Sequence, residues 1–330
     1  MNKRKTNDMN ENHVAVNSGK AFLLAARPKT LSGAVVPVMI GVALAIHDMG
    51  WDRFVSPVAG DWYRMPLVPA LLCFLFAMVM QVDANFVNDY FDCVRGKDDR
   101  ETRLGPKRAC TEGWVTLPAM RCCLVVTTML ACLVGLPLVC FGGWEMILVG
   151  VACVLFCFLY TTLLAQHGLG DVLVLLFFGL VPVCLTYYVT MPPALQTVNS
   201  QVVWASIACG MVIDTLLVLN NYRDYDQDRA VGKLTLVVRI GRQGAELFYK
   251  ELGLWAAAIM WICLVPRGSS FSMWLLCFVC FGPYVLFHQV TMLKMRRIGR
   301  GKELNKVLGM TARNMFIFGV TTAIVILFII

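Results

Sequence analysis

Residues 66–92 read PLVPALLCFLFAMVMQVDANFVNDYFD, an apolar run that closes on asparagine and aspartate side chains. A helix needs about 20 mostly apolar residues to cross the hydrocarbon core of a bilayer. The run is long enough, so it predicts a membrane-spanning helix whose last turns carry polar groups. Those groups then lie where the helix leaves the membrane.

Eight further apolar stretches flank this one along the chain. Together the nine predicted spans cover about residues 31–49, 66–90, 117–139, 143–163, 169–191, 201–222, 252–266, 272–292 and 311–330. The chain is 58% hydrophobic and 15% charged, whereas a soluble domain is roughly 45–50% apolar. The sequence therefore predicts an all-α integral membrane protein, with nine transmembrane helices in a bundle.

Basic residues gather on one side of the predicted spans. With the N-terminus in the cytoplasm, 26 of the 29 Lys and Arg residues fall in cytoplasmic segments, where membrane proteins carry their excess positive charge. This topology accounts for the net charge of +8. No RNA- or DNA-reading motif accompanies the basic runs, so we expect membrane lipid and a phosphorylated ligand as partners, and no nucleic acid.

The ends and the cysteines complete the domain organisation. Residues 1–20 are polar and have no apolar core, which predicts a disordered cytoplasmic tail and no cleavable signal peptide. Residues 21–330 then form a single transmembrane domain. Most of the 14 cysteines lie inside predicted spans, where they act as small apolar side chains and form neither disulfides nor a zinc site.

The polar ending of residues 66–92 occurs a second time. Asn88-x-x-x-Asp92 closes the second predicted helix and Asn220-x-x-x-Asp224 closes the sixth, and both members of the pair shift by the same 132 residues. Four helices separate the two copies, so both have the same orientation in the membrane. We interpret this as a parallel duplication of a four-helix unit, with the ninth helix added.

Side chains four residues apart share one face of a helix. Carboxylates at the end of an apolar span are costly unless they are paired, hydrated or bound to metal. Packing of the second and sixth helices is expected to bring about four carboxylates together, a ligand set that suits Mg²⁺. Nearby cations can grip a diphosphate: Arg95, Lys97, Arg103, Lys107, Arg108, Arg223, Lys233 and Arg239.

Two other interpretations stay open on these residues alone. The acids and cations can be ordinary solvation and topology residues at helix ends. A transporter or channel also carries intramembrane acids, although its acids belong near the middle of the bilayer and these lie at helix ends.

Several motifs resemble the UbiA superfamily of intramembrane aromatic prenyltransferases, over nearly the whole chain from Arg27 onward. They are Arg27-Pro28-Lys29-Thr30, Asn85 to Asp92 with Gly96-Lys97-Asp98, Arg103 to Arg108, Tyr160-Thr161, His167 to Asp171, Phe177-Phe178-Gly179, Thr186-Tyr187-Tyr188, Asn220 to Asp228, and Gly232 to Leu236.

The resemblance implies residue roles. It implies Mg²⁺ as cofactor, held by Asn88, Asp92, Asp98, Asp224 and Asp228, with Asn88, Asp92, Asp224 and Asp228 as catalytic residues. It implies a polyprenyl diphosphate and an aromatic acid as substrates, bound by Arg27, Lys29, Lys97, Arg103, Arg108, Tyr160, Arg223 and Lys233. It also implies a bacterial inner membrane, with the active site facing the cytoplasm.

Within the superfamily, Gly96 followed by Asp98 resembles the naphthoate branch. That branch transfers the prenyl group to 1,4-dihydroxy-2-naphthoate with loss of CO₂, giving demethylmenaquinone; hydroxybenzoate and homogentisate are the alternative acceptors. Tyr160, Tyr187 or Tyr222 are candidates to stabilise a carbocation. His167 is a candidate to orient or deprotonate the acceptor, while residues 162–166 depart from the Gly-Pro-rich pattern of similar proteins.

Overall fold

Nearly every apolar run of the chain becomes a long helix. A computed structural model describes residues 14–57, 61, 64–96, 103–162 and 164–330, and within these ranges it contains helices and no strand. Among the described residues, eight helical spans are long and apolar enough to cross a membrane: α2 (Ser32–Met49), α4 (Leu67–Val94), Leu117–Gly142, Gly170–Thr190, α10 (Ser200–Arg223), α12 (Leu236–Leu264), α13 (Phe271–Ile298) and α14 (Leu304–Phe328). The chain is therefore a multi-pass membrane protein.

Two of these spans are composite, and the remaining helices are shorter. Leu117–Gly142 consists of α5 (Leu117–Gly135), η4 (Leu136–Leu138) and α6 (Val139–Gly142), while Gly170–Thr190 consists of α8 (Gly170–Val174), η6 (Leu175–Leu180) and α9 (Val181–Thr190). The apolar helix α7 (Glu145–Thr162) is 18 residues long, as α2 is, but its apolar stretch Glu145–Tyr160 is shorter than each of the eight spans. The others are α1 (Gly19–Ala26), η2 (Pro28–Thr30), α3 (Trp51–Phe54), η5 (Leu164–His167), η7 (Pro193–Leu195) and α11 (Tyr225–Ala230).

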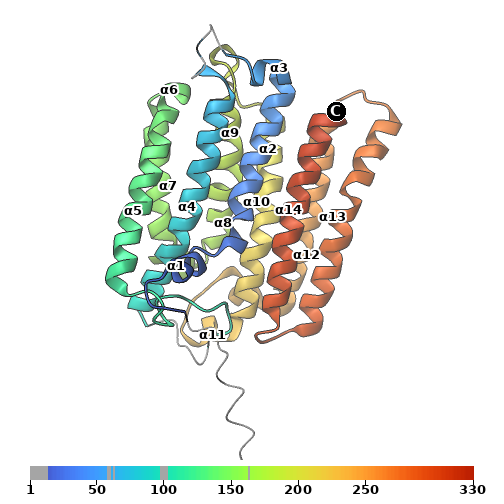
Figure 1. The fold of residues 1–330 in the computed structure, drawn as a ribbon. Coiled ribbons are helices and arrows are strands. Elements are labelled where there is room, and N and C mark those ends of the chain that lie inside the picture. The colour runs from blue at the N-terminus through green and yellow to red at the C-terminus, as the bar shows by residue number, and fades with distance from the viewer. Residues whose placement is uncertain (1–13, 58–60, 62–63, 97–102, 163) are drawn as a thin grey trace, which may run out of the picture.

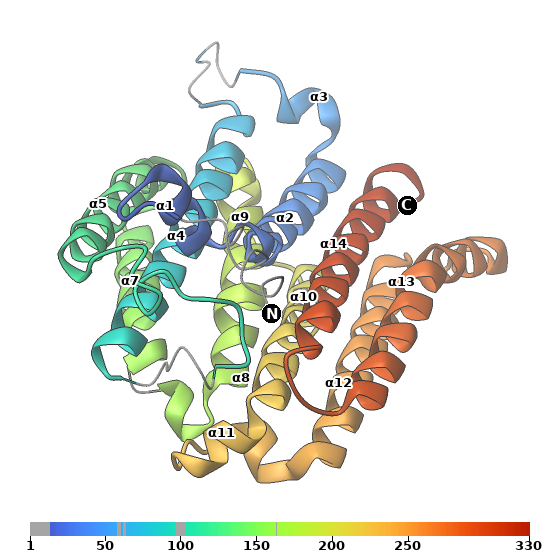
Figure 2. The same ribbon diagram turned by 60° about the horizontal axis from the view of Figure 1, so that its bottom comes forward.

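The long helices run side by side in one bundle, with α5 and α7 at one edge and α12, α13 and α14 at the other (Figures 1 and 2). Helix α10 packs mainly against α12, η6 and α14, whereas α4 packs mainly against α5, α2 and α7. The main hydrophobic core lies between α2, α9, α10, α12 and α14. The two helices that carry the repeated polar motif therefore belong to different halves of the bundle.

Helix α10 meets η6 at two glycines. A side chain at Gly179 would come within 2.7 Å of the Ser206 carbonyl oxygen and 2.8 Å of the Gly210 Cα. Small residues allow this approach between helices in a membrane, so only glycine fits here. The contact fixes η6 against α10 beside the cavity described below.

Helix α12 begins well before the predicted span at 252. Residues 242–251 include several charged side chains, which lowers the hydropathy there, yet one face of this segment is apolar and packs inward through Ala245 and Tyr249. The helix bends at Gly241, where φ is 73°. Helix α14 likewise begins at Leu304 rather than at 311, because a helix continues past the membrane wherever tertiary packing supports it.

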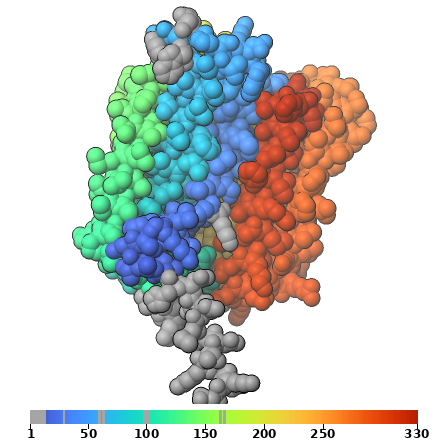
Figure 3. Space-filling view, viewed as in Figure 1, coloured from blue at the N-terminus to red at the C-terminus, as the bar shows by residue number. Residues whose placement is uncertain are grey.

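The start of the chain packs differently from the prediction. Residues 1–13 of the predicted tail lie outside the described residues, but residues 14–20 contact the bundle: Asn17 accepts a 3.0 Å hydrogen bond from the Thr116 amide, and Ser18 caps α1. Figure 3 shows α1 lying on the surface of the bundle over one end of α4. A disordered tail to residue 20 is therefore wrong for residues 14–20, because polar capping and burial of Val14 order them.

Candidate functional site

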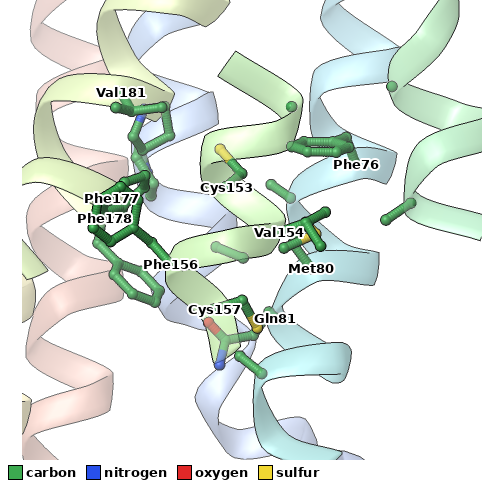
Figure 4. Close-up of a pocket in the computed structure, with 18 of the residues that line it drawn as sticks. Phe76, Met80, Gln81, Cys153, Val154, Phe156, Cys157, Phe177, Phe178 and Val181 are labelled. Atoms are coloured by element: carbon green, nitrogen blue, oxygen red, sulfur yellow. The ribbon is translucent and has the colours of Figure 1, made fainter. Parts of the chain in front are cut away.

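A mostly apolar cavity of about 470 Å³ opens inside the first half of the bundle. Figure 4 shows its walls, formed by side chains of α4, α7, η6 and α9, of which Gln81 is the one amide among those labelled. The volume lies in the range of small-molecule sites. The walls also include side chains of α5, η4 and α7 that are exposed on the outer surface, such as Leu136 and Val151.

Polar side chains collect at one end of this cavity. Asn85 and Asn88 come from the last turns of α4, Tyr160 from the end of α7, and Asn220 from the last turn of α10. The three helices run in the same direction, so their carboxyl ends meet at one end of the bundle. Arg27, just before η2, reaches the same end. The asparagine of each copy of the motif therefore lines one cavity, although the two helices pack in different halves.

The first polar cluster, at the end of α4, uses its two aspartates differently. Asp92 lies one turn beyond Asn88 and forms a 2.7 Å ion pair with Arg108 Nη2, and both side chains are mostly buried. Asp89 is fully buried and accepts hydrogen bonds of 2.9 and 3.1 Å from the amides of Ala109 and Cys110. Asp92 thus faces a cation, whereas Asp89 anchors the loop that carries this cation.

The second polar cluster lies where α10 ends. Arg223 is 4% exposed and holds both carboxylate oxygens of Asp224, at 2.8 and 2.7 Å. Asp228, on α11, accepts from Lys233 Nζ with both oxygens at 3.1 Å. Burial raises the pKa of Asp228, and the charge of Lys233 counteracts part of this rise. In this cluster each acid has a cation close by in the sequence.

A loop links the two clusters. The carbonyl of Leu104 accepts a 2.8 Å hydrogen bond from Asn305, whose amide oxygen in turn accepts 3.0 Å from Arg223 Nη1. A side chain at Gly105 would lie 2.9 Å from Arg223 Nη2 and 3.1 Å from Arg103 Nη2. The loop therefore passes close over the Arg223 guanidinium, and Arg108 at its far end pairs with Asp92.

The turn before α2 is fixed by the first cluster. Asn85 donates hydrogen bonds to the Ala26 carbonyl at 2.8 Å and to the Thr30 hydroxyl at 3.0 Å. Arg27 adopts the left-handed conformation, with φ 51°. The hydrogen bonds hold this turn so that Arg27 lies at the polar end of the cavity. Lys29 belongs to η2, but its side chain is outside the described part of the structure.

Of the predicted site residues, Arg27, Asn88 and Tyr160 line the cavity, whereas Asp92, Asp224 and Asp228 belong to the two clusters and are not among its lining residues. Lys97 and Asp98 lie outside the described residues. Tyr187 and Tyr222 are not among the residues that line the cavity. Tyr187 donates a hydrogen bond to Asp48 at 2.5 Å near the opposite end of the bundle, and Tyr222 donates one to Glu246 at 2.8 Å. Those two tyrosines are therefore wrong as carbocation candidates, because their hydroxyls serve helix packing, and Tyr160 is the one that lines the cavity.

Within the described residues, no three His, Cys, Asp or Glu side chains converge to hold a metal ion by themselves. His167 is exposed, and its carbonyl accepts 2.9 Å from Arg239. Sequence reasoning missed Asn305, which lies in no repeated motif and whose importance depends on a contact 201 residues away.

Most of the chain is similar in sequence to proteins of one known family. The family described as "UbiA prenyltransferase family" matches residues 34–319. A 1,4-dihydroxy-2-naphthoate octaprenyltransferase of Escherichia coli (strain K12) is 33% identical over 77% of this chain and 79% of its own length. The enzyme of the same name from Haemophilus influenzae is 30% identical over 82% and 85%. The apo structure of a UbiA homolog from Aeropyrum pernix K1 matches with a TM-score of 0.63 at 14% identity, covering 89% of this chain and 97% of that one.

Proposed function

The chain belongs to the UbiA prenyltransferase family, and from this premise we propose that it transfers a polyprenyl group from polyprenyl diphosphate to 1,4-dihydroxy-2-naphthoate, giving the hydroquinone form of demethylmenaquinone with release of diphosphate and CO₂. The acceptor is supported by the two bacterial relatives that carry this activity in their names and match most of this chain. In the reaction the C–O bond to diphosphate breaks and a C–C bond forms at the carboxyl-bearing ring carbon. The carboxylate then leaves as CO₂, and its electron pair restores the aromatic ring.

One observation carries the proposal: the last turns of α4 and α10, each next to one polar cluster, reach the polar end of a single apolar cavity. Asn88 and Asn220, the first members of the two motifs, both line it. A polyprenyl diphosphate has the same division into a charged end and an apolar chain. An ion pathway would place its acids near the middle of the membrane, whereas the proposed ligands Asp92, Asp224 and Asp228 lie at or just beyond helix ends, which favours the transferase over the transporter.

The donor set fits a magnesium ion that arrives with its diphosphate. Mg²⁺ usually binds through one or two carboxylates plus substrate phosphates and water, so three converging acids are not required. Asn88 and Asp92 from one cluster and Asp224 and Asp228 from the other offer only oxygen ligands, and Asp98 is the fifth proposed ligand. Bound Mg²⁺ would neutralise charge on the leaving diphosphate.

Cations at the same end provide the remaining charge for the diphosphate. Arg108 and Arg223 are mostly buried and already held by carboxylates, so their guanidinium groups are oriented before the substrate binds. Lys233 pairs with Asp228, and Arg27 lines the cavity. We assign these four, with Arg103, Lys29 and Lys97, to diphosphate binding. Exchange of a carboxylate for a phosphate oxygen then needs little movement.

The cavity walls protect the reactive end of the prenyl chain. Apolar side chains exclude water from an allylic carbocation, and the Tyr160 ring at the polar end can stabilise it by a cation–π interaction, on the order of 1–2 kcal/mol. Exposed wall residues such as Leu136 and Val151 give the isoprenoid tail a route toward the lipid between α5 and α7.

We further propose the membrane arrangement predicted by the charge distribution. Helix α7 serves as a ninth span, the N-terminus and both clusters face the cytoplasm, and residues from about 21 onward form one domain of a bacterial inner membrane. To test this orientation, cysteines are introduced into α3 and into the loop after α10, and the accessibility of each to a thiol reagent is measured. Labelling of the α10 loop by an impermeant thiol reagent in right-side-out vesicles contradicts it.

An acceptor panel tests the function. Full-length protein in detergent with Mg²⁺ and a polyprenyl diphosphate is assayed against 1,4-dihydroxy-2-naphthoate, 4-hydroxybenzoate and homogentisate, with product mass and CO₂ release from carboxyl-labelled acceptor as readouts. We expect one CO₂ per naphthoate prenylated. Prenylation of hydroxybenzoate alone rejects the acceptor, and no prenylation of any acceptor, together with ion flux in liposomes, rejects the enzyme.

A further inference from the structure

A second hollow lies far from the cavity, at the α13–α14 turn. Its volume is about 860 Å³. The lining residues are Val290, Leu293, Lys294, Arg297, Ile298, Arg300, Glu303 and Lys306. Helix α13 ends at Ile298 on the side of the bundle where α10 also ends (Figure 1), so the hollow is at the same membrane face as the two polar clusters.

The hollow is divided between an apolar and a cationic part. Along α13 it begins with Val290 and Leu293, which are 46% and 58% exposed, and one turn later it carries Lys294 and Arg297. The first two residues face the outside of the bundle where a membrane helix meets acyl chains. The next two lie in the last turns of α13, which ends at Ile298, so the apolar and cationic parts of the hollow adjoin each other there.

The cations of the hollow outnumber its acids by four to one. Glu303 forms an exposed 3.6 Å pair with Lys306, and Arg300 reaches Asp226 only at 4.0 Å with both side chains exposed. Among the residues that the structure describes, Lys294 and Arg297 have no carboxylate within ion-pair distance, whereas the neighbouring Arg296 pairs with Glu246 at 3.5 Å. Two cations therefore face the hollow without an internal counter-charge.

The turn that closes the hollow is held in place. Arg242 donates to the Gly299 carbonyl at 2.7 Å and to Asp226 at 2.9 Å, and its guanidinium also lies against the rings of Tyr222 and Tyr225. These contacts join the α13–α14 turn to α10, α11 and α12. The backbone at this end of the hollow is thus tied to three other helices.

We propose that this hollow binds an anionic phospholipid, with its phosphate at Lys294 and Arg297 and its acyl chains along Val290 and Leu293. Basic pockets at the membrane interface attract anionic headgroups, and the adjoining apolar surface distinguishes a lipid from a free anion. The preference for Lys and Arg in cytoplasmic segments also places positive charge on this face. That preference, however, requires neither a hollow nor cations without an ion-pair partner. The inference is independent of the transferase activity.

The test uses two double variants with the same charge change. Lys294→Gln/Arg297→Gln alters the hollow, and Arg296→Gln/Lys302→Gln alters neighbouring exposed cations outside it. Full-length protein in nanodiscs of phosphatidylcholine with increasing phosphatidylglycerol is analysed for bound lipid by native mass spectrometry. At about 1 kcal/mol for each interfacial cation, we expect the first variant to lose on the order of thirtyfold in phosphatidylglycerol affinity, and the second to lose less than threefold.

Further measurements separate a lipid site from diffuse surface charge and from a free-anion site. Equal losses in both double variants overturn the proposal in favour of diffuse surface charge. Competition by inorganic phosphate or glycerol phosphate as effective as by the lipid identifies a free-anion site and also overturns it, as does unaltered lipid binding in the first variant. All four substituted side chains are exposed, so thermal unfolding without added lipid is expected to match the unmodified protein and to exclude misfolding.

Discussion

The ends of α4 and α10 carry the same Asn-x-x-x-Asp spacing but complete it in different ways. Helix α4 continues past Asp92 to Val94, and the cation for Asp92 comes from Arg108, on a loop 16 residues later. Helix α10 stops at Arg223, and the cation for Asp224 is that same neighbouring residue. One cluster depends on tertiary structure and the other is nearly complete within its own segment. The difference shows that two copies of one residue spacing can be supported by different contacts.

The largest expected effect concerns the two equivalent aspartates. Asp92→Asn and Asp224→Asn each remove a proposed metal ligand, so we expect kcat/KM for naphthoate prenylation to fall on the order of 10²- to 10³-fold in both. Asp226→Asn, an exposed acid beside the second cluster, serves as the control and is expected to change activity less than threefold. Full activity in both substituted proteins removes the metal assignment, and a large loss in only one assigns the ion to that cluster.

A substitution at Asp89 tests whether the first cluster depends on the loop that Asp89 anchors. Asp89→Asn leaves a buried backbone amide facing an NH₂ group, which costs about 1–3 kcal/mol. We expect a lower midpoint of thermal unfolding in detergent, with activity per folded molecule reduced less than tenfold. Asp52→Asn on the exposed α3 is the matched control. A loss of activity as large as that of Asp92→Asn, with unchanged unfolding, would show that Asp89 acts in the chemistry.

The cations of the two clusters are expected to affect substrate binding to different extents, and these effects are smaller than those of the aspartates. Arg108 is 11% exposed and Lys233 is 28% exposed, and a buried charge is screened less by water. We therefore expect Arg108→Gln to raise KM for polyprenyl diphosphate about tenfold and Lys233→Gln about threefold. Arg108→Lys, which restores charge without the bidentate group, is expected to recover part of the loss. An equal rise in KM for the two Gln substitutions would mean that burial does not determine how strongly each cation contributes to diphosphate binding.

The smallest expected effect is a pH dependence of stability in Mg²⁺-free buffer with chelator. Burial raises the pKa of Asp228 above its ordinary value of 3.8, so the folded protein binds that proton more tightly than the unfolded chain does. The stabilisation is present below the unfolded pKa and is lost as pH rises through the folded pKa. Lys233→Gln removes the charge that lowers this pKa, so the decline should extend to higher pH. Asp228→Asn should abolish it, and an unchanged profile there would assign it to another group.

Much of the architecture follows from the sequence because it depends on local hydropathy. The apolar run of residues 66–92 predicts α4 within a few residues, and the fixed offset between Asn88 and Asn220 predicts that both lie at the same end of the bundle. The start of α12 is not predictable in this way. Its first turns are amphipathic, and their helical state depends on packing of Ala245 and Tyr249 against other helices.

The supporting contacts of the site also lie beyond sequence patterns. Asp89 and Asp92 look alike in the motif, and only the position of the Ala109 and Cys110 amides separates an anchor from a candidate ligand. Asn305 stands alone in the first turn of α14, with no repeat to mark it. Its role arises from two hydrogen bonds to distant segments, which no local periodicity encodes.

The link through Asn305 bears on how the protein matures. During synthesis α4 and its cluster enter the membrane first and α10 follows, but the residue that joins Leu104 to Arg223 arrives only at the start of α14. A nascent chain that stops before α14 therefore holds both clusters without the hydrogen bonds that connect them. Biogenesis thus completes the site late, after the helices that enclose its cavity are in place.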